Sequence, residues 1–262
     1  MKVGKAYQRI IREKKSELGK PKAGFFFDSP ILQSFPNADI KKAELQEISY
    51  KEAKRIILEY EWLGTMGTTQ YHYGILFENE LAGVVCFGYF QAMGNIDNGG
   101  GYGTYVGEKY VDRGIQLTRG ACVHWAHPHS GSKLISYGLL QMKKLGYKYV
   151  VAFSDPKAGE IGTLYQATNW YYLGFSDGER VHYDIWDKEN DKVWMNDRDI
   201  FKKYGFSGKV KMEKFVSERP TLEVRLRKAK ARYMKLIGSR KENKEMFSFL
   251  QDKIKSYPKR KN

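Results

Sequence analysis

Apolar positions in this 262-residue chain fall into short continuous runs typical of strands and into spaced positions typical of helices. Residues 71–90, YHYGILFENELAGVVCFGYF, hold two apolar runs around a polar tripeptide, which predicts a hairpin. Further strands are predicted at 115–126 and 147–155, and helices are predicted at 49–64, 127–146 and 161–174. The alternation of these elements predicts an α/β (α+β) fold, with a mixed central sheet flanked by helices.

The pattern after residue 175 is more polar. A last strand or hairpin is expected within 180–196, and the basic segments 221–238 and 243–257 are expected to be helical. The Gly-rich stretch 95–114 has no regular period, so it is expected to be a loop.

Charge is distributed unevenly along the chain, whose net charge is +15. Residues 207–262 carry 18 Lys and Arg against 6 Asp and Glu, and residues 1–22 carry 8 against 2, so the rest of the chain has a net charge of −3. A nearly neutral body with two basic ends favours a polyanionic partner such as nucleic acid. Solvated tails that aid solubility would give the same composition.

The two cysteines, Cys86 and Cys122, lie in apolar strand-like runs. This is expected of reduced core residues in a protein of the cytoplasm. No apolar run approaches the roughly 18 residues that a membrane-spanning helix needs, so no membrane partner is expected.

The stretch HPHSGSKLISYGLL, which begins at His127, joins a predicted strand to a predicted helix. The N-terminus of a helix presents free backbone N–H groups and the positive end of the helix dipole, so it suits an anion. Gly131 would let the backbone approach a ligand, and Ser132 would cap the helix. The alternative is that Ser132 is a cap with no ligand beside it.

The order strand, turn, helix, strand and then a helix that holds Tyr165 before YLGF resembles the GNAT acyltransferases. In that family the turn holds the pyrophosphate of coenzyme A, and a tyrosine near the LY…GF pattern protonates the departing thiolate. The resemblance implies a GNAT-like acyltransferase fold and acetyl-CoA or a related acyl donor. It also implies a cofactor site at Ser130, Gly131, Ser132 and Lys133, where HPHSGSK replaces the usual Q/R-x-x-G-x-G/A turn.

A narrower resemblance covers about residues 45–185. The segments LTRGACVHWAHPHSGSKLIS and AFSDPKAGEIGTLYQATNWYYLG resemble the Mom proteins. These have a GNAT-like fold and convert adenine in phage DNA to N6-carbamoylmethyladenine, which protects that DNA from host restriction. The Mom pattern is matched by Arg119, Ser132, Asp155 and Tyr165, in this order. The resemblance implies that these four residues are catalytic and that the protein acts in the host cytoplasm.

With this resemblance the chain divides into three expected parts. These are a basic N-terminal arm and loop at 1–44, a GNAT-like catalytic domain at 45–206 and a basic helical C-terminal extension at 207–262 that contacts DNA.

Asp155 stands at the end of a predicted buried strand, where open α/β sheets bind ligands. The N6 lone pair of adenine is delocalised into the ring, so a nearby carboxylate would help by accepting its proton, with Tyr165 as an acid or a donor-binding group. The structural alternatives are a turn or cap residue for Asp155 and a core aromatic for Tyr165. Arg119 in an apolar strand would bind phosphate, pair with Asp155 or reach an exposed strand end.

A metal site is a further hypothesis. His72 and Tyr73 in QYHYG, together with Asp155, match the ligands of an iron site proposed for Mom proteins, and a histidine with oxygen ligands suits iron(II). The alternative is that His72 simply begins a strand. The histidines of HWAHPHS at 124–130 lack the four ligands of a structural zinc site at the required spacing.

The C-terminal segment interleaves basic and aromatic residues, which favours contacts with the phosphates of double-stranded DNA. The DNA-binding residues expected there are Lys228, Lys230, Arg232, Arg240 and Lys241. A base inside a duplex must be extruded before it is modified. An aromatic residue would then stack on it, unless these residues belong to the core; the candidates are Trp170, Tyr171 and Tyr172.

Three functions are therefore compared. A Mom-type DNA adenine modification enzyme is the leading hypothesis. A GNAT acyltransferase that acts on a protein or small-molecule amine would share the fold, but the basic ends argue against it. A non-catalytic nucleic-acid-binding protein would share the basic ends, but Asp155 and Tyr165 argue against it. The oligomeric state is left open, with a homodimer among the options.

Overall fold

The computed structural model describes residues 5–17, 39–90, 101–175, 183–187, 203–205, 214–219, 221–226 and 230–260. The chain forms two compact units, one of Met1–Gly174 with Ala231–Asn262 and one of Phe175–Lys230. In the described part of the chain, no helix is long and apolar enough to cross a membrane.

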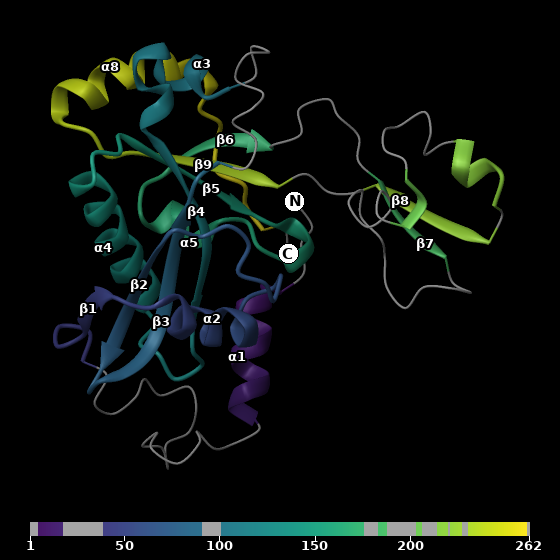
Figure 1. The fold of residues 1–262 in the computed structure, drawn as a ribbon, viewed down its shortest axis with the longest axis horizontal. Coiled ribbons are helices and arrows are strands. Elements are labelled where there is room, and N and C mark those ends of the chain that lie inside the picture. Colours follow the sequence, from purple (N-terminus) through teal and green to yellow (C-terminus); the bar gives the residue numbers. More distant parts are fainter. Residues whose placement is uncertain are drawn as a thin grey trace. The chain divides into compact units, whose positions relative to one another are not determined.

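The first unit is built on a seven-stranded sheet (Figure 1). Its strands are β1 (Glu44–Glu47), β2 (Tyr71–Phe77), β3 (Glu80–Gly88), β4 (Gly114–Cys122), β5 (Tyr149–Ser154), β6 (Tyr171–Phe175) and β9 (Ala231–Leu236). They lie in the order β1-β2-β3-β4-β5-β9-β6. β4 and β5 pair in parallel, whereas β3–β4 and β5–β9 are antiparallel, so the predicted mixed sheet is confirmed.

The predicted hairpin is formed by β2 and β3. Its turn places Glu78 at φ 49° and Asn79 at φ 66°. Two successive positive φ values are typical of the tight turns whose twist matches that of paired strands. Almost every residue of both strands is buried, because helices cover both faces of the sheet at this point.

The helices of the first unit are α1 (Tyr7–Glu17), α2 (Tyr50–Tyr60), α3 (Gly103–Val106), α4 (Ser130–Lys144), α5 (Thr163–Ala167) and α8 (Arg240–Leu250). Shorter 3₁₀ turns are η2 (Glu108–Arg113), η3 (Pro156–Ala158) and η4 (Gln251–Lys253). α2 begins with the predicted capping box, in which Ser49 and Glu52 bond each other's backbone. The stretch expected to be a loop at 95–114 contains α3 and η2, so it is largely helical where it is described.

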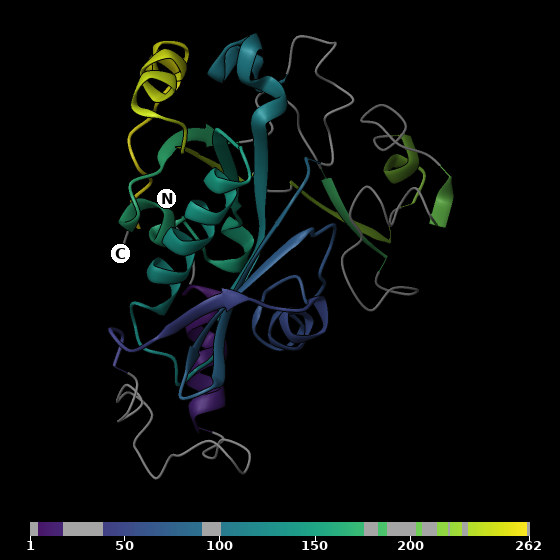
Figure 2. The ribbon, with the colours of Figure 1, turned by 60° about the vertical axis from the view of Figure 1, so that its left-hand side comes forward.

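Helices α2 and α4 cover opposite faces of the sheet (Figure 2). Ile56 and Ile57 of α2 and Leu134 and Met142 of α4 enter one core cluster with the central strands. This arrangement buries the apolar stripe of each helix and leaves the C-terminal ends of β4 and β5 open at one edge of the sheet.

The parallel strands β4 and β5 separate toward these C-terminal ends. Their pairing runs from Gly114 opposite Tyr149 to Leu117 opposite Ala152 and stops there. Beyond that point β4 pairs only with β3, and β5 pairs only with β9. The two segments that follow these strands therefore begin on either side of an opening in the sheet.

The prediction of a helix at 221–238 was wrong. This segment contains β8 (Leu222–Leu226) and β9, and β9 lies inside the sheet between β5 and β6. Tyr233 and Met234 are fully buried on opposite faces of β9, and this burial outweighs the helix propensity of the neighbouring Lys and Arg. Residues 231–262 belong to the first unit, so the part expected as a separate basic extension instead completes the main sheet.

The second expected C-terminal helix is present as α8, which begins after a capping box formed by Ser239 and Glu242. The strand expected within 180–196 is also present, as β7 (Tyr183–Asp187), but it pairs with β8 in the second unit. That unit has a small core of its own, formed by Ile185, Phe215 and Leu222.

Candidate active site

The loop after β5 carries Asp155. This residue caps η3, and its Oδ1 accepts a hydrogen bond of 2.9 Å from the backbone N–H of Lys157. The structural alternative for Asp155 is therefore realised, but the cap uses one carboxylate oxygen and leaves Oδ2 for a substrate. Asp155 is half-buried and directly follows β5, at the end of the sheet where β4 and β5 separate.

The rest of this loop is held from three sides. Tyr233 of β9 donates its hydroxyl to the carbonyl of Ile161, and Gln166 of α5 donates to the same carbonyl at 2.9 Å. Arg260 donates to the carbonyl of Gly159 at 2.6 Å. The C-terminal end of the chain and β9 therefore fix the loop, which is the kind of support that a catalytic group requires.

Glu160 is the residue in this loop that the sequence analysis missed. The pKa of its carboxyl is raised from 4.5 to about 7, first by burial and then by the negative charges of Glu61 and Asp155, whereas Arg260 acts in the opposite direction. A carboxyl with a pKa near neutrality exchanges protons readily at physiological pH. The available signal was an acidic residue between two glycines, GEIG, directly after a buried strand.

Tyr165 belongs to the same region. Its ring packs against Trp170 at 5.1 Å and Tyr233 at 5.3 Å between centroids, so the core alternative is also realised. Burial raises the pKa of the Tyr165 hydroxyl, and the charges of Glu160 and Glu61 raise it further. The hydroxyl therefore stays protonated and is suited to donate a proton or a hydrogen bond.

Glu61, from a distant part of the sequence, also belongs to this group. It follows α2 as the C-cap, and its side chain accepts a hydrogen bond of 2.8 Å from the backbone of Leu63. Its charge raises the pKa values of both Glu160 and Tyr165, so the end of α2 lies near the loop after β5. Three carboxylates and one tyrosine therefore gather around this edge of the sheet.

Arg119 does not pair with Asp155. Its Nε donates to the carbonyl of Thr65 at 2.6 Å, and its Nη1 donates to the carbonyl of Thr118 at 2.6 Å. These bonds tie the turn after α2 to β4, which none of the three sequence hypotheses anticipated. A guanidinium held by neutral carbonyls keeps its full positive charge, so Arg119 still adds positive potential near the opening.

The turn before α4 differs from its prediction in detail. α4 begins at Ser130 with His129 as the N-cap, and Ser132 donates its hydroxyl to the carbonyl of His129 at 3.0 Å, so the expectation that Ser132 caps the helix was wrong. Lys133 donates to the carbonyl of Ile40. The Ser130 hydroxyl is fully buried and has no hydrogen-bond partner within the described residues.

The main chain of this turn fits an anionic cofactor group better than its side chains do. The first N–H groups of an α-helix have no intrahelical acceptor, so those of Gly131 and Ser132 are the ones left for a phosphate. A Cβ at Gly131 would lie 3.1 Å from Cδ2 of Leu164 in α5, so a larger residue there would require the Leu164 side chain to shift by a few tenths of an ångström. The unpartnered hydroxyl of Ser130 lies in the same turn.

The proposed iron ligands are not brought together. His72 and Tyr73 are neighbours on β2, so they point to opposite faces of the sheet. His72 is bonded to Thr69 at 2.9 Å and packs on Tyr50 of α2, whereas Tyr73 packs on Tyr137 of α4. Within the described residues, no group of three His, Cys, Asp or Glu side chains is placed to hold a metal ion.

The residues predicted to contact DNA differ in how exposed they are. Arg240 and Lys241 are exposed at the start of α8, and Lys230 is exposed before β9. Arg232 bonds the hydroxyl of Tyr105 at 3.3 Å, and Lys228 lies outside the described residues. Of the aromatic residues proposed to stack on a flipped base, Trp170 and Tyr172 are buried in the core, which leaves only Tyr171 half-exposed.

A model of the Mom protein family matches residues 42–259. No curated protein matches the chain. The match to the family spans both compact units and extends well beyond the 45–185 region of the sequence resemblance.

Acetyltransferases of low identity are among the solved structures that match. An IAA acetyltransferase from Bacillus cereus ATCC 14579 has 11% identity and a TM-score of 0.40, and the match covers 74% of this chain and 99% of that chain. An N-acetyltransferase from Staphylococcus aureus Mu50 has 14% identity and a TM-score of 0.40, over 74% and 98%. A Bacillus subtilis acetyltransferase in complex with CoA has 12% identity and a TM-score of 0.38, over 74% and 97%. On the evidence of the family match, this chain belongs to the Mom protein family.

Proposed function

We propose that this protein modifies adenine in double-stranded DNA to N6-carbamoylmethyladenine and thereby protects phage DNA from restriction in the host cytoplasm. Membership of the Mom family supports the type of substrate. The observation that carries the proposal is the carboxyl of Glu160, whose pKa is raised to about 7 beside Asp155 and Tyr165 in a tethered loop. Groups with such shifted pKa values, gathered where strands end, are typical of catalytic sites.

The roles follow from the protonation states. Asp155 accepts a hydrogen bond from the exocyclic amine of adenine through its free Oδ2. Glu160 takes the proton of that amine as the new N–C bond forms, because its pKa lies near physiological pH. Tyr165, whose pKa is raised, remains protonated and donates to the departing group.

The donor site lies at the turn before α4. The N–H groups of Gly131 and Ser132 would hold a phosphate of acetyl-CoA or of a related acyl donor. Plain acyl transfer from such a thioester would give an N-acyladenine, so the carbamoylmethyl product requires a donor in which N6 attacks the methylene carbon of the transferred group and not an acyl carbon. The residues of this chain orient the donor beside the loop after β5 and accept the proton that leaves N6.

The basic surface supplies affinity for DNA. Arg240 and Lys241 are exposed at the N-terminus of α8, and Arg9 is exposed on α1. Contacts of this kind bind phosphates without reading sequence, so they hold the duplex while an extruded base enters the site.

A second candidate is the acylation of a protein or small-molecule amine. The observation that favours it is the acidity of the site, since Glu61, Asp155 and Glu160 would attract a protonated amine. DNA phosphates would be repelled by the same charges, so in the first proposal only the neutral base approaches them.

The test is mass spectrometry of nucleosides from the DNA of cells that express this chain. We expect deoxyadenosine carrying a carbamoylmethyl group in cells with the wild-type protein and not in cells with Asp155→Asn. Soluble protein with only unmodified deoxyadenosine would overturn the first proposal. New acylated amines among the proteins or small molecules of the same cells would then favour the second.

A further inference from the structure

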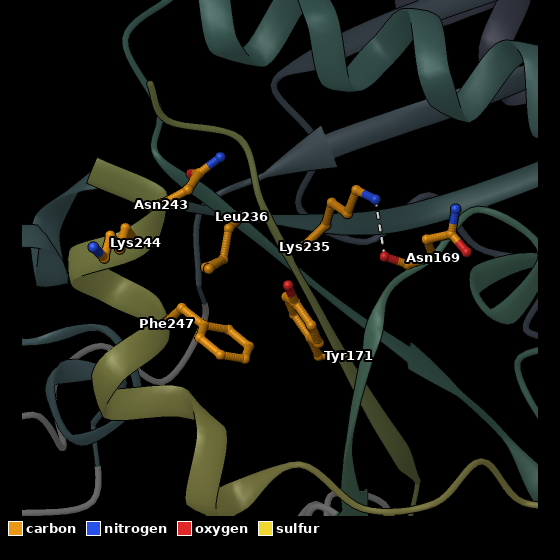
Figure 3. Close-up of a pocket in the computed structure, with 7 residues that line it drawn as sticks. All are labelled: Asn169, Tyr171, Lys235, Leu236, Asn243, Lys244 and Phe247. Atoms are coloured by element: carbon orange, nitrogen blue, oxygen red, sulfur yellow. Dashed lines mark hydrogen bonds between the residues drawn. The ribbon is translucent and has the colours of Figure 1, made fainter. Parts of the chain in front are cut away.

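A pocket lies between β6, β9 and α8 (Figure 3). Its volume is about 280 Å³, which is ample for a nucleobase. Seven residues line it: Asn169, Tyr171, Lys235, Leu236, Asn243, Lys244 and Phe247. Two aromatic rings, two amides and two lysines thus surround Leu236, the one aliphatic side chain of the lining.

The rings of Tyr171 and Phe247 form one wall of this pocket. Their centroids are 5.6 Å apart and their planes meet at 46°, and Leu236 points toward them (Figure 3). A flat ligand between two rings needs a spacing of about 7 Å, twice the usual contact distance between carbon atoms. A base therefore cannot slip between them and would stack on the exposed side of Phe247, whose exposed fraction is 36%.

The rim of the pocket is cationic. Lys235 donates to the carbonyls of Thr168 at 2.9 Å and Asn169 at 2.8 Å, and burial lowers the pKa of its ammonium group. Lys244 is exposed on α8. Within the described residues, no carboxylate forms an ion pair with either lysine. Their ammonium groups point to opposite sides of the pocket, and Lys235 is held by its two carbonyls, so Lys244 is the cation that an anion in the pocket would meet (Figure 3).

The amide oxygen of Asn243 is not available to a ligand. It is buried without a hydrogen-bond partner within the described residues, and a Cβ added at Gly238 would lie 3.1 Å from it, so it faces the turn before α8. A ligand that combines a flat ring with a negative charge therefore suits the aromatic wall and Lys244.

We propose that this pocket binds one unstacked nucleotide of a DNA strand, with its base on the Phe247 wall and its phosphate beside Lys244. The inference rests on the proposed function, since it takes the ligand to be the DNA that is modified. Stacking on aromatic side chains combined with phosphate contacts is the general way in which proteins hold single-stranded nucleic acid.

The pocket does not hold the target adenine. β9 pairs with β5 from Leu236 opposite Tyr149 to Ala231 opposite Ser154. Five residues of strand separate these ends by about 17 Å, so the pocket lies at the opposite end of β5 from Asp155. Stacked nucleotides of one strand are about 3.4 Å apart, so the pocket binds a nucleotide a few positions from the one that is modified.

The test is fluorescence anisotropy with a labelled single-stranded oligonucleotide of about 12 nucleotides, within the range that such proteins cover. We expect Phe247→Ala in the full chain to weaken binding about tenfold, and Phe247→Tyr to keep near-normal affinity because the ring remains. Phe249→Ala is the matched control, since Phe249 is exposed on the same helix but does not line the pocket. Lys244→Gln should weaken binding more than Lys143→Gln, which removes an exposed charge on α4, away from the pocket lining and from the residues proposed to bind DNA.

An abasic oligonucleotide and free dAMP complete the design. The effect of Phe247→Ala should disappear with the abasic strand, because no base is left to stack. An equal loss with the abasic strand, or no loss with the normal strand in a variant that melts like the wild type, overturns the proposal. Tight binding of dAMP without binding of the oligonucleotide overturns the assignment to a DNA strand.

The outcome for the pocket is separable from the outcome for the function. If modified deoxyadenosine forms in cells but the Phe247 variants bind normally, only the pocket is disproved. If the pocket binds the strand but no modified base forms, only the proposed function fails.

Discussion

The turn before α4 and the loop after β5 leave the sheet at the same edge, yet they differ in what their side chains are free to do. In the turn, Ser132 and Lys133 bond backbone carbonyls of the protein itself. In the loop, Glu160 has a pKa raised to about 7 and Asp155 keeps one carboxylate oxygen free. In the proposed reaction the turn would therefore act through its main chain, whereas the loop would act through its side chains.

The largest loss of activity is expected when the titratable groups of the loop after β5, or Tyr165 of the adjoining helix α5, are removed. We expect Glu160→Gln, Asp155→Asn and Tyr165→Phe each to lower the rate of modification by about 100- to 10,000-fold, the usual loss for a general acid or base. Each change preserves shape and, for Asp155, the ability to cap a helix. The measurement is the yield of modified adenine beside a melting curve. Near-normal yield from all three variants would return these residues to purely structural roles.

The titration of Glu160 gives the second prediction. Because its carboxylate form accepts the proton, activity should rise with pH through about 7, and Glu160→Gln should lose that limb of the profile. The free energy of unfolding, in contrast, should fall as pH rises through the same range. A carboxyl whose pKa is raised from 4.5 to about 7 on folding favours the folded state at low pH, and this contribution is lost as pH rises through that window. Melting temperatures at pH 5 and pH 8 should therefore differ more for the wild type than for Glu160→Gln, and equal differences would contradict the assignment.

Gly162 gives a smaller, structural test of how the loop is held. It has φ +72°, and an added Cβ would lie 2.3 Å from the ring of Tyr233. Gly162→Ala should cost about 3 kcal/mol of unfolding free energy, from backbone strain together with overpacking. Gly64→Ala is the matched control, because Gly64 has φ +56° with no atom within 4 Å, so strain alone should cost about 1 kcal/mol. Denaturant unfolding measures the loss of unfolding free energy in both variants. Equal losses would mean that the Tyr233 side chain moves aside to make room for the added methyl group.

The smallest effect is expected at the turn before α4. Ser132→Ala removes a hydroxyl that bonds only the carbonyl of His129, so the rate of modification should change by less than about threefold. A loss as large as that of Glu160→Gln would show that the Ser132 side chain touches the reacting groups, and the contrast between the two segments would no longer hold.

The prediction of elements was most successful where a local pattern decides the structure. The hairpin of β2 and β3 follows from two apolar runs around a polar tripeptide, and α2 follows from its capping box. The positions of Asp155 and Tyr165 near one sheet edge also follow from element order, because both come after the same buried strand. These features depend on neighbours along the chain, which the sequence displays directly.

The sequence by itself therefore determined the mixed α/β fold, the family and the loop in which Asp155 lies. Only the tertiary structure decided that residues 231–236 form a strand of the main sheet, because their burial comes from β5 and β6, which are distant in sequence. For the same reason it alone decided the raised pKa of Glu160, which depends on Glu61 from α2 and on burial by remote elements. It also separated His72 from Tyr73 by placing helices on both faces of their strand. Charge, burial and pairing between distant segments are properties of the folded chain, and no local pattern contains them.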